Sequence, residues 1–405
     1  YTTNLVFNGS SRFVRVTANP TAAAAGAAWS STLTVLRSNA VSYGVTNFLA
    51  GNLVWPPATA PVAPATLSAP RGVALDSTGN VYVADSGNNR IVRLSQAMTI
   101  VNFTALTGVA GTNGTVLPFT AGVPVITIGL KSPGGVGVNP TNGDIYVADT
   151  LNHQVKRYDT NGALQFTWGD PLFSSGSDDS GAPGFPNGRL NGPQGIAIGT
   201  NGVVYVADTG GNSIRQISGN AMTTLTMPLV VGLLSGPRAV VVVGTNLYIA
   251  DTDNHRLVSY SSATSGGVLA GTIGVSGTTD GIGIGALFNL PSGITVDGYG
   301  NLYVSDAGSH RIRRVTTFGE VQTIAGSSAG NLNDDVGTSA QFDTPRALAA
   351  DPFGAILVAE DSANNSVRVI APYQTHTPTN SFAMILPFTG PVANTQPIGS
   401  SAVIV

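Results

Sequence analysis

PRGVALDSTGNVYVADSGNNRIVRL, residues 70–94, decides the fold because the chain repeats this pattern five more times. The later copies are PGGVGVNPTNGDIYVADTLNHQVKRY from Pro133, PQGIAIGTNGVVYVADTGGNSIRQI from Pro193, PRAVVVVGTNLYIADTDNHRLVSY from Pro237, PSGITVDGYGNLYVSDAGSHRIRRV from Pro291 and PRALAADPFGAILVAEDSANNSVRVI from Pro345. In every copy the aspartate assigned to the end of the second strand lies 14 to 16 residues after the leading proline. Self-similarity at a steady spacing predicts a repeat architecture.

Each copy predicts a β-meander. A short apolar strand such as GVALD comes first, and a turn rich in Gly and Asn follows it, as a tight hairpin requires. The second strand alternates as V-Y-V-A-D, and the third reads RIVRL or RIRRV. Fourth strands are less regular, as in GGVLAG and VQTIAG. Four antiparallel strands in each of six units predict an all-β, six-bladed β-propeller.

The ends of the chain predict how the ring closes. No segment after Ile370 resembles a fourth strand, but VTNFLAG, residues 45–51, does. Gly51 precedes Pro70 by 19 residues, close to the 20 between Gly271 and Pro291. We therefore expect an N-terminal strand to complete the last blade, which removes the free edges at the seam. This interpretation divides the chain into a propeller, 45–370, an N-terminal β extension, 1–44, and a C-terminal extension, 371–405.

Both extensions carry apolar runs, among them FAMILPF over residues 382–388 and the terminal AVIV. An apolar strand at a chain terminus must pair with something. Either the two extensions pair with each other and cap the propeller, or one strand is donated to a neighbouring subunit. Both arrangements stay open at this point.

Composition restricts the classes of function. Charged residues make up 10% of the chain, the net charge is −3, and Lys131 and Lys156 are the two lysines. Nucleic-acid binding needs clustered basic residues and is not expected. There is no cysteine, and no apolar run approaches the roughly 18 residues of a membrane span. The chain begins at Tyr1, so either a leader has been removed or the chain is partial. The Thr-, Asn- and Gly-rich composition favours an extracellular or cell-surface location.

The string DTDNHRL, residues 251–257, and its variant DAGSHRI, residues 306–312, resemble the NHL repeat, as does the connector AGTIGVSGTTDGIGIGALFNLPSGI, residues 270–294. The resemblance covers about residues 45–370 and implies a six-bladed propeller. NHL propellers serve as RNA-binding modules, as scaffolds of extracellular proteins, and as lyases or hydrolases with a site in the central channel. The resemblance therefore leaves function open.

Three of the four histidines, His153, His255 and His310, lie four residues after a repeat aspartate. Asparagines occupy the matching positions of the other repeats, namely Asn89, Asn212 and Asn365. This register spreads the histidines around the rim, so we predict a structural role in the turn and no metal site. The resemblance implies that amidating lyases among the relatives need convergent histidine ligands at the channel mouth. No further histidine of the repeats could supply them here, and His376 lies outside the repeats.

We also predict a structural, turn-holding role for the repeat aspartates, which are Asp85, Asp149, Asp208, Asp251, Asp306 and Asp361. An arginine five residues on can pair with three of them, giving Asp85–Arg90, Asp251–Arg256 and Asp306–Arg311. The matching residues of the other repeats are Gln154, Ser213 and Ser366, so binding of the turn backbone is the general role.

Two carboxylate-rich loops, residues 175–184 and 330–338, could bind calcium but lack the ligand spacing of a defined calcium loop. No cofactor, metal ligand or catalytic residue is predicted. Candidate glycosylation sites are Asn8, Asn102, Asn113 and Asn364, and the Pro/Thr-rich segment 55–70 could carry O-glycans.

Together these features predict a non-enzymatic, extracellular structural or interaction protein. It would be a subunit of a cell-surface or filamentous assembly that self-associates through its terminal strands, and it would be glycosylated. The alternative is a propeller enzyme of lactonase, hydrolase or lyase type with a site in the central channel. First strands rich in Gly, Val, Ala and Ile offer that alternative little chemistry.

Overall fold

The computed structural model describes residues 14–17, 42–49, 67–94, 100–102, 115–116, 126–127, 129–170, 188–327, 337–351, 355–361, 365–373 and 401–404. The chain forms two compact units. One comprises residues 44–371, and the other comprises residues 1–43 with 372–405.

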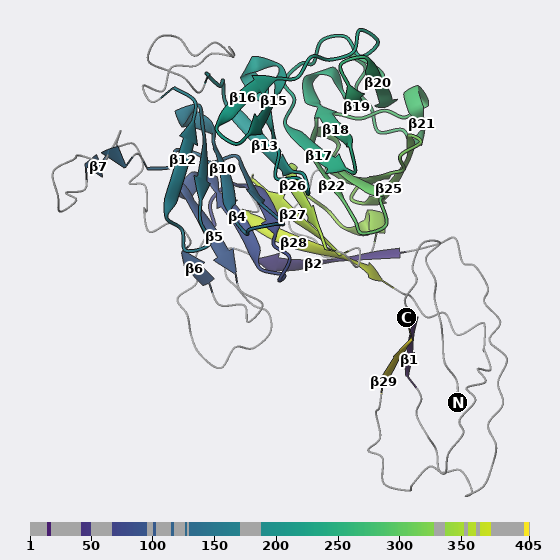
Figure 1. Cartoon of the computed structure of the whole chain (residues 1–405). Coiled ribbons are helices and arrows are strands. Elements are labelled where there is room, and N and C mark those ends of the chain that lie inside the picture. The colour runs from purple at the N-terminus through teal and green to yellow at the C-terminus, as the bar shows by residue number, and fades with distance from the viewer. Residues whose placement is uncertain are drawn as a thin grey trace, which may run out of the picture. The chain divides into compact units, whose positions relative to one another are not determined.

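Six antiparallel sheets form a six-bladed β-propeller (Figure 1). The first sheet contains β3 (Pro70–Leu75), β4 (Val81–Asp85), β5 (Arg90–Leu94) and β6 (Ile100–Asn102). The second contains β9 (Gly135–Val138), β10 (Ile145–Asp149), β11 (Gln154–Tyr158) and β12 (Leu164–Trp168). The third contains β13 (Pro193–Ile198), β14 (Val204–Asp208), β15 (Ser213–Ser218) and β16 (Ala221–Thr224). The predicted all-β propeller fold is confirmed.

The fourth sheet contains β17 (Ala239–Val243), β18 (Asn246–Asp251), β19 (Arg256–Ser262) and β20 (Ser265–Ala270). The fifth contains β22 (Pro291–Val296), β23 (Leu302–Asp306), β24 (Arg311–Val315) and β25 (Glu320–Ala325), with β21 (Gly281–Ile282) added beside β25. The sixth contains β26 (Pro345–Ala350), β27 (Ile356–Glu360) and β28 (Ser366–Tyr373), and its fourth member is β2 (Ser42–Leu49).

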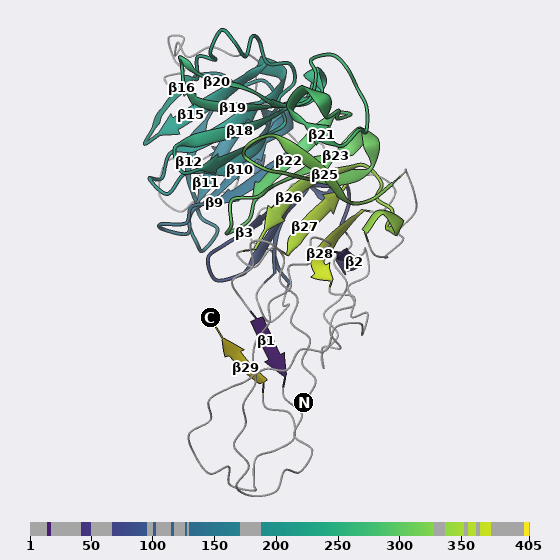
Figure 2. The same ribbon diagram turned by 90° about the vertical axis from the view of Figure 1, so that its right-hand side faces the viewer.

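The first strand of every sheet faces the centre of the ring. Strands β3, β9, β13, β17, β22 and β26 contact one another in this order, and β26 contacts β3 again. Figure 2 shows the ribbon diagram of Figure 1 turned by 90°. This closed cycle surrounds a central channel, so residues at equal positions of different first strands lie at equal depth.

The second strands form the core between neighbouring sheets. All five residues of β4, β10 and β23 are buried, including the tyrosine and the aspartate of each strand. Both faces of these strands are covered, because each sheet packs between two others. One cluster, for example, joins Tyr82 and Ala84 of the first sheet to Val136 and Val147 of the second.

Short 3-10 turns follow the second strands. They are η1 (Ser86–Asn88), η2 (Thr150–Asn152), η3 (Thr209–Gly211), η4 (Thr252–Asn254) and η6 (Ala307–Ser309), and two further turns are η5 (Gly283–Gly285) and η7 (Gly337–Ser339). None of the helices among the described residues could cross a membrane.

Among the described residues, two strand pairs lie outside the six sheets. β1 (Val14–Thr17) and β29 (Ser401–Ile404) pair antiparallel, with Val14 opposite Ile404. β7 (Thr115–Val116) pairs with β8 (Ile126–Thr127). The N-terminal and C-terminal extensions therefore contribute one strand each to a common two-stranded ladder.

Candidate functional site

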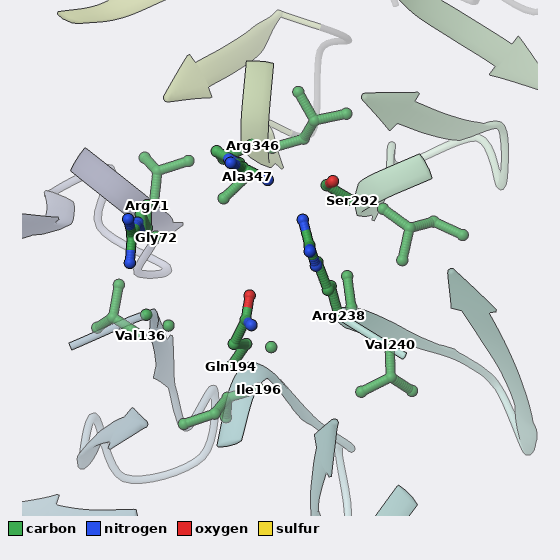
Figure 3. A pocket seen from close by; sticks show the side chains of 18 residues that line it. Arg71, Gly72, Val136, Gln194, Ile196, Arg238, Val240, Ser292, Arg346 and Ala347 are labelled. Atoms are coloured by element: carbon green, nitrogen blue, oxygen red, sulfur yellow. The ribbon is translucent and has the colours of Figure 1, made fainter. Parts of the chain in front are cut away.

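The residue after the leading proline of each repeat faces the mouth of the central channel. These six positions line one cavity of about 220 Å³. We call them the mouth ring, which consists of Arg71, Gly134, Gln194, Arg238, Ser292 and Arg346. Figure 3 shows the larger side chains of the mouth ring around a common space.

Two further layers of the first strands line the same cavity. The position after the mouth ring is small in every repeat: Gly72, Gly135, Gly195, Ala239, Gly293 and Ala347. The next position forms an aliphatic belt of Val73, Val136, Ile196, Val240, Ile294 and Leu348. A Cβ on Gly195 would lie 2.5 Å from the Arg238 carbonyl oxygen, whereas the Gly195 N–H donates to that oxygen at 2.9 Å. Glycine thus lets neighbouring first strands approach closely.

Asp361 bridges two arginines of the mouth ring. Its Oδ2 lies 3.0 Å from Arg71 Nε, and its Oδ1 lies 3.0 Å from Arg346 Nε. The Asp361 side chain is 5% exposed. Arg71 belongs to the first repeat and Asp361 to the sixth, so this bridge also joins the last blade to the first.

Arg238 has no such partner. Within the described ranges its guanidinium makes no hydrogen bond or ion pair, and its Nε is buried. Burial lowers the pKa of Arg238, as does the charge of Arg346, while Asp253 and Asp361 oppose the shift. Arginine nevertheless keeps its charge at neutral pH. The three guanidinium groups of the mouth ring outnumber the two carboxylates that act on Arg238, those of Asp253 and Asp361, which leaves the channel mouth positive and suited to an oxyanion.

The repeat aspartates lie at the same end of the sheets as the mouth ring, buried where each second strand ends and paired with the leading proline. Asp85 Oδ1 accepts the Ser68 N–H at 2.7 Å. The same bond joins Lys131 to Asp149, Asn191 to Asp208, Ser235 to Asp251 and Asn289 to Asp306, at 2.6 to 2.7 Å. Each carboxylate thereby holds the segment that leads into its own first strand.

Every repeat also pairs its buried carboxylate with a cation of the third strand. Two predicted pairs are present, since Arg90 Nε lies 2.7 Å from Asp85 and Arg256 Nε lies 2.7 Å from Asp251. The predicted Asp306–Arg311 pair is wrong, because Arg313 takes that place at 2.9 Å. Burial raises the pKa of Asp306 to about 6, against the Asn289 N–H and the Arg313 charge.

The expected lack of a cation in three repeats is also wrong. Lys156, Arg215 and Arg368 reach Asp149, Asp208 and Glu360. They stand two residues after the polar Gln154, Ser213 and Ser366. Because residues i and i+2 of a strand point to the same side, either position can fill the same space.

In the sixth repeat Glu360, and not Asp361, occupies the aspartate position. Glu360 pairs with Pro345 in the register in which Asp85 pairs with Pro70. Its Oε2 accepts the Asp343 N–H at 3.0 Å. The prediction of a turn-holding role for Asp361 is therefore wrong by one residue, because this repeat has a longer turn.

Asp361 instead stands where four of the other five repeats carry a hydroxyl. Ser86, Thr150, Thr209 and Thr252 follow the repeat aspartate and donate to the carbonyl of the next repeat's leading proline, as in Thr150 Oγ1 to Pro193 at 2.7 Å. A carboxylate cannot donate such a bond. At this seam the ion pair to Arg71 replaces the hydroxyl contact.

The histidines and their matching asparagines connect each blade to the next. His153 Nδ1 accepts the Gly192 N–H at 3.0 Å, and His255 and His310 accept the Leu290 and Thr344 N–H groups. Asn89, Asn212 and Asn365 accept the equivalent N–H groups of Ser132, Gly236 and Ala69 through Oδ1. All six residues have a positive φ, which Asn and His tolerate better than most residues. The histidines are thus spread around the ring.

Several predicted features lie outside the described residues. These are the carboxylate-rich loop 175–184, residues 330–336 of the other carboxylate-rich loop, the candidate sites Asn8, Asn113 and Asn364, and His376. Asn102 is the last residue of β6, opposite Val92. In the parts of the chain that the structure describes, no group of three His, Asp or Glu side chains could hold a metal ion.

Sequence reasoning missed the mouth ring. The dipeptide Pro-Arg begins three of the six repeats, at Pro70, Pro237 and Pro345, and this was the available signal. Arginines of the third strands have a different role: Arg215, Arg313 and Arg368 are fully buried as partners of the repeat carboxylates.

Comparison with known proteins agrees with this geometry. The family model of the NHL repeat matches residues 67–94, 130–158, 190–217 and 288–315. The chain is an NHL-repeat propeller. This NHL propeller is 26% identical over 271 residues to Protein SUPPRESSOR OF QUENCHING 1, chloroplastic, of Arabidopsis thaliana, covering 60% of this chain and 25% of that protein. It is 27% identical over 290 residues to human NHL repeat-containing protein 2, covering 60% of this chain and 39% of the relative. The chain thus spans well under half the length of these relatives.

Solved structures share the fold at low identity. A structural genomics protein of unknown function from Bacteroides thetaiotaomicron superposes with a TM-score of 0.61 and 16% identity, over 91% of this chain and 89% of that one. A streptogramin B lyase superposes with a TM-score of 0.51 and 16% identity, over 82% of this chain and 98% of that one. The NHL propeller is similar to them in fold.

Proposed function

We propose that this NHL propeller is a non-enzymatic interaction protein whose ring is a rigid scaffold for contact surfaces. The observation that carries this proposal is the exposure of large apolar side chains. Leu229, Leu233 and Phe318 have exposed fractions of 101%, 90% and 91%. Such side chains are unfavourable in water, and clusters of them mark sites where proteins contact one another.

Six of the exposed apolar side chains form two clusters. Leu229, Val230 and Leu233 lie in the connection from β16 to β17, which we call the apolar loop. Phe318 lies in the turn between β24 and β25. Beside this turn, Gly283 donates to the Gly319 carbonyl at 2.9 Å, so the exposed Ile282 and Ile284 flank it. Each cluster offers three apolar side chains to a partner.

The partner we propose is a second copy of this chain, with terminal strands contributing to self-association. The pairing of β1 with β29 supports a role for these strands, since among the described residues each pairs with one strand alone and can offer its other edge to a further strand. The low charge and the hydroxyl- and amide-rich composition support an extracellular or cell-surface location. Glycans on the candidate asparagines, of which Asn102 lies on an edge strand, belong to the same proposal.

Sedimentation velocity of the full chain tests self-association. We expect assembled species that shift to monomer in Leu229→Ser/Leu233→Ser, and a similar loss in Val403→Pro, because proline removes a ladder N–H. Leu151→Ser is the matched control, because Leu151 is an exposed leucine of η2 that belongs to neither cluster. Assemblies seen by negative stain would show the form of the polymer. A wild-type chain that stays monomeric at all concentrations would overturn the proposal.

The alternative function is a propeller enzyme with its site in the channel. The likeness to streptogramin B lyase concerns fold alone at 16% identity. The mouth ring offers guanidinium, amide and hydroxyl groups, and Asp361 is held between two arginines. Turnover of a lactone or ester by the purified monomer would favour this alternative.

A further inference from the structure

We propose that the mouth ring and the aliphatic belt together bind a small organic carboxylate, with the carboxylate group at Arg238 and the carbon chain directed along the channel. This site is separate from the apolar clusters that carry the proposed interaction function. Each proposal can therefore fail without the other.

The charge of the mouth ring selects an anion. Arg71 and Arg346 share Asp361, whereas Arg238 makes no hydrogen bond or ion pair within the described ranges. Three guanidinium groups converge from three separate repeats around one space (Figure 3). Repulsion among them is relieved when an oxyanion enters, and a guanidinium fork matches the two oxygens of a carboxylate.

The backbone holds Arg238 in place for this purpose. Its carbonyl accepts the Gly195 N–H at 2.9 Å, and its own N–H donates to the Ala250 carbonyl at 3.2 Å. Arg238 is therefore fixed between the third and fourth blades while its side chain reaches the cavity. Gln194 and Ser292 add an amide and a hydroxyl to the same wall. A preorganised site of this kind loses less entropy on binding than a flexible one.

The aliphatic belt, two positions after the mouth ring, selects what is attached to the carboxylate. Each of the six repeats contributes one aliphatic side chain to this belt, and all six line the same cavity. Inorganic phosphate would contact the arginines but leave the belt unused. The volume of about 220 Å³ is below the roughly 300–1,000 Å³ typical of pockets for drug-sized ligands, so the ligand is small.

Calorimetric titration of the full chain with acetate, butyrate and hexanoate tests this assignment, with hexanol and inorganic phosphate as comparison ligands. We expect affinity to rise with chain length, by up to about fourfold for each buried methylene. Hexanol should bind at least tenfold more weakly than hexanoate. Equal binding of hexanol and hexanoate, binding of phosphate alone, or no binding of hexanoate would each overturn the proposal.

Variants locate the site. Arg238→Gln should weaken hexanoate at least tenfold, whereas Arg314→Gln, which alters an arginine of β24 outside the cavity, should leave it unchanged. Asp361→Asn removes the competing carboxylate and should tighten hexanoate binding. Ile196→Ala should weaken hexanoate more than acetate. Circular dichroism confirms that each variant is folded, and hexanoate binding unaffected by both Arg238→Gln and Ile196→Ala would place the ligand elsewhere.

Discussion

The buried cation of each repeat can be moved between two positions of the third strand. Arg256 pairs with Asp251 and is 3% exposed, and Val258 stands two residues further on. In the preceding repeat the matching residues are Ser213 and Arg215, and Arg215 pairs with Asp208. Arg256→Ser alone should therefore strand a buried carboxylate, and adding Val258→Arg should restore its partner.

The structure supports both the size of the stability loss expected for Arg256→Ser and its recovery in the double variant. Breaking a buried ion pair costs about 3–5 kcal/mol, because the remaining charge is left uncompensated. For a unit of roughly 330 residues this corresponds to a fall of about 4–7 °C in the unfolding midpoint. An arginine at position 258 would find a backbone carbonyl to donate to. Arg215 Nη1 donates to the Arg189 carbonyl at 2.7 Å, and the equivalent Leu233 carbonyl already accepts from Arg256 Nη2 at 3.3 Å.

Thermal unfolding followed by circular dichroism provides the assay. We expect Arg256→Ser to lose about 3–5 kcal/mol and the double variant to return to within about 1 kcal/mol of the wild type. Arg314→Gln should change stability by less than about 1 kcal/mol, because Arg314 makes no ion pair in the described part of the chain. An unchanged midpoint for Arg256→Ser, or a double variant no better than the single one, would refute the reasoning.

Two further predictions concern the contacts between blades. Burial lowers the pKa of His153 below its usual 6.5, and its neutral Nδ1 accepts the Gly192 N–H. Stability is therefore lost as pH falls below about 6.5 through the folded pKa, and His153→Asn should lose less between pH 7.5 and pH 5, as measured by unfolding midpoints. An equal loss in both proteins would contradict this. Gly195→Ala should destabilise the propeller by about 1–3 kcal/mol, because the new Cβ would lie 2.5 Å from the Arg238 carbonyl oxygen. Gly267→Ala, which meets nothing within 4 Å, is the control, and equal denaturation midpoints for the two variants would argue against close strand contact.

The repeat pattern predicted the fold and the general role of the turn residues. It failed for Asp361 because matching by letter preferred an aspartate to the adjacent Glu360, and only strand pairing shows which one faces the turn. It failed for Arg311 because the pairing rule counted five residues and ignored that Arg313 points to the same side. Both errors concern register within a repeat that was itself correctly located.

The sequence by itself determined the six-bladed propeller, because six copies of one meander repeat its turns and apolar alternation. It also indicated that the histidines are dispersed, since asparagine replaces them at equal positions. Only the tertiary structure decided that Arg71, Arg238 and Arg346 meet at one channel mouth. These arginines are separated by more than a hundred residues at each step along the chain, and closure of the ring is what brings them together.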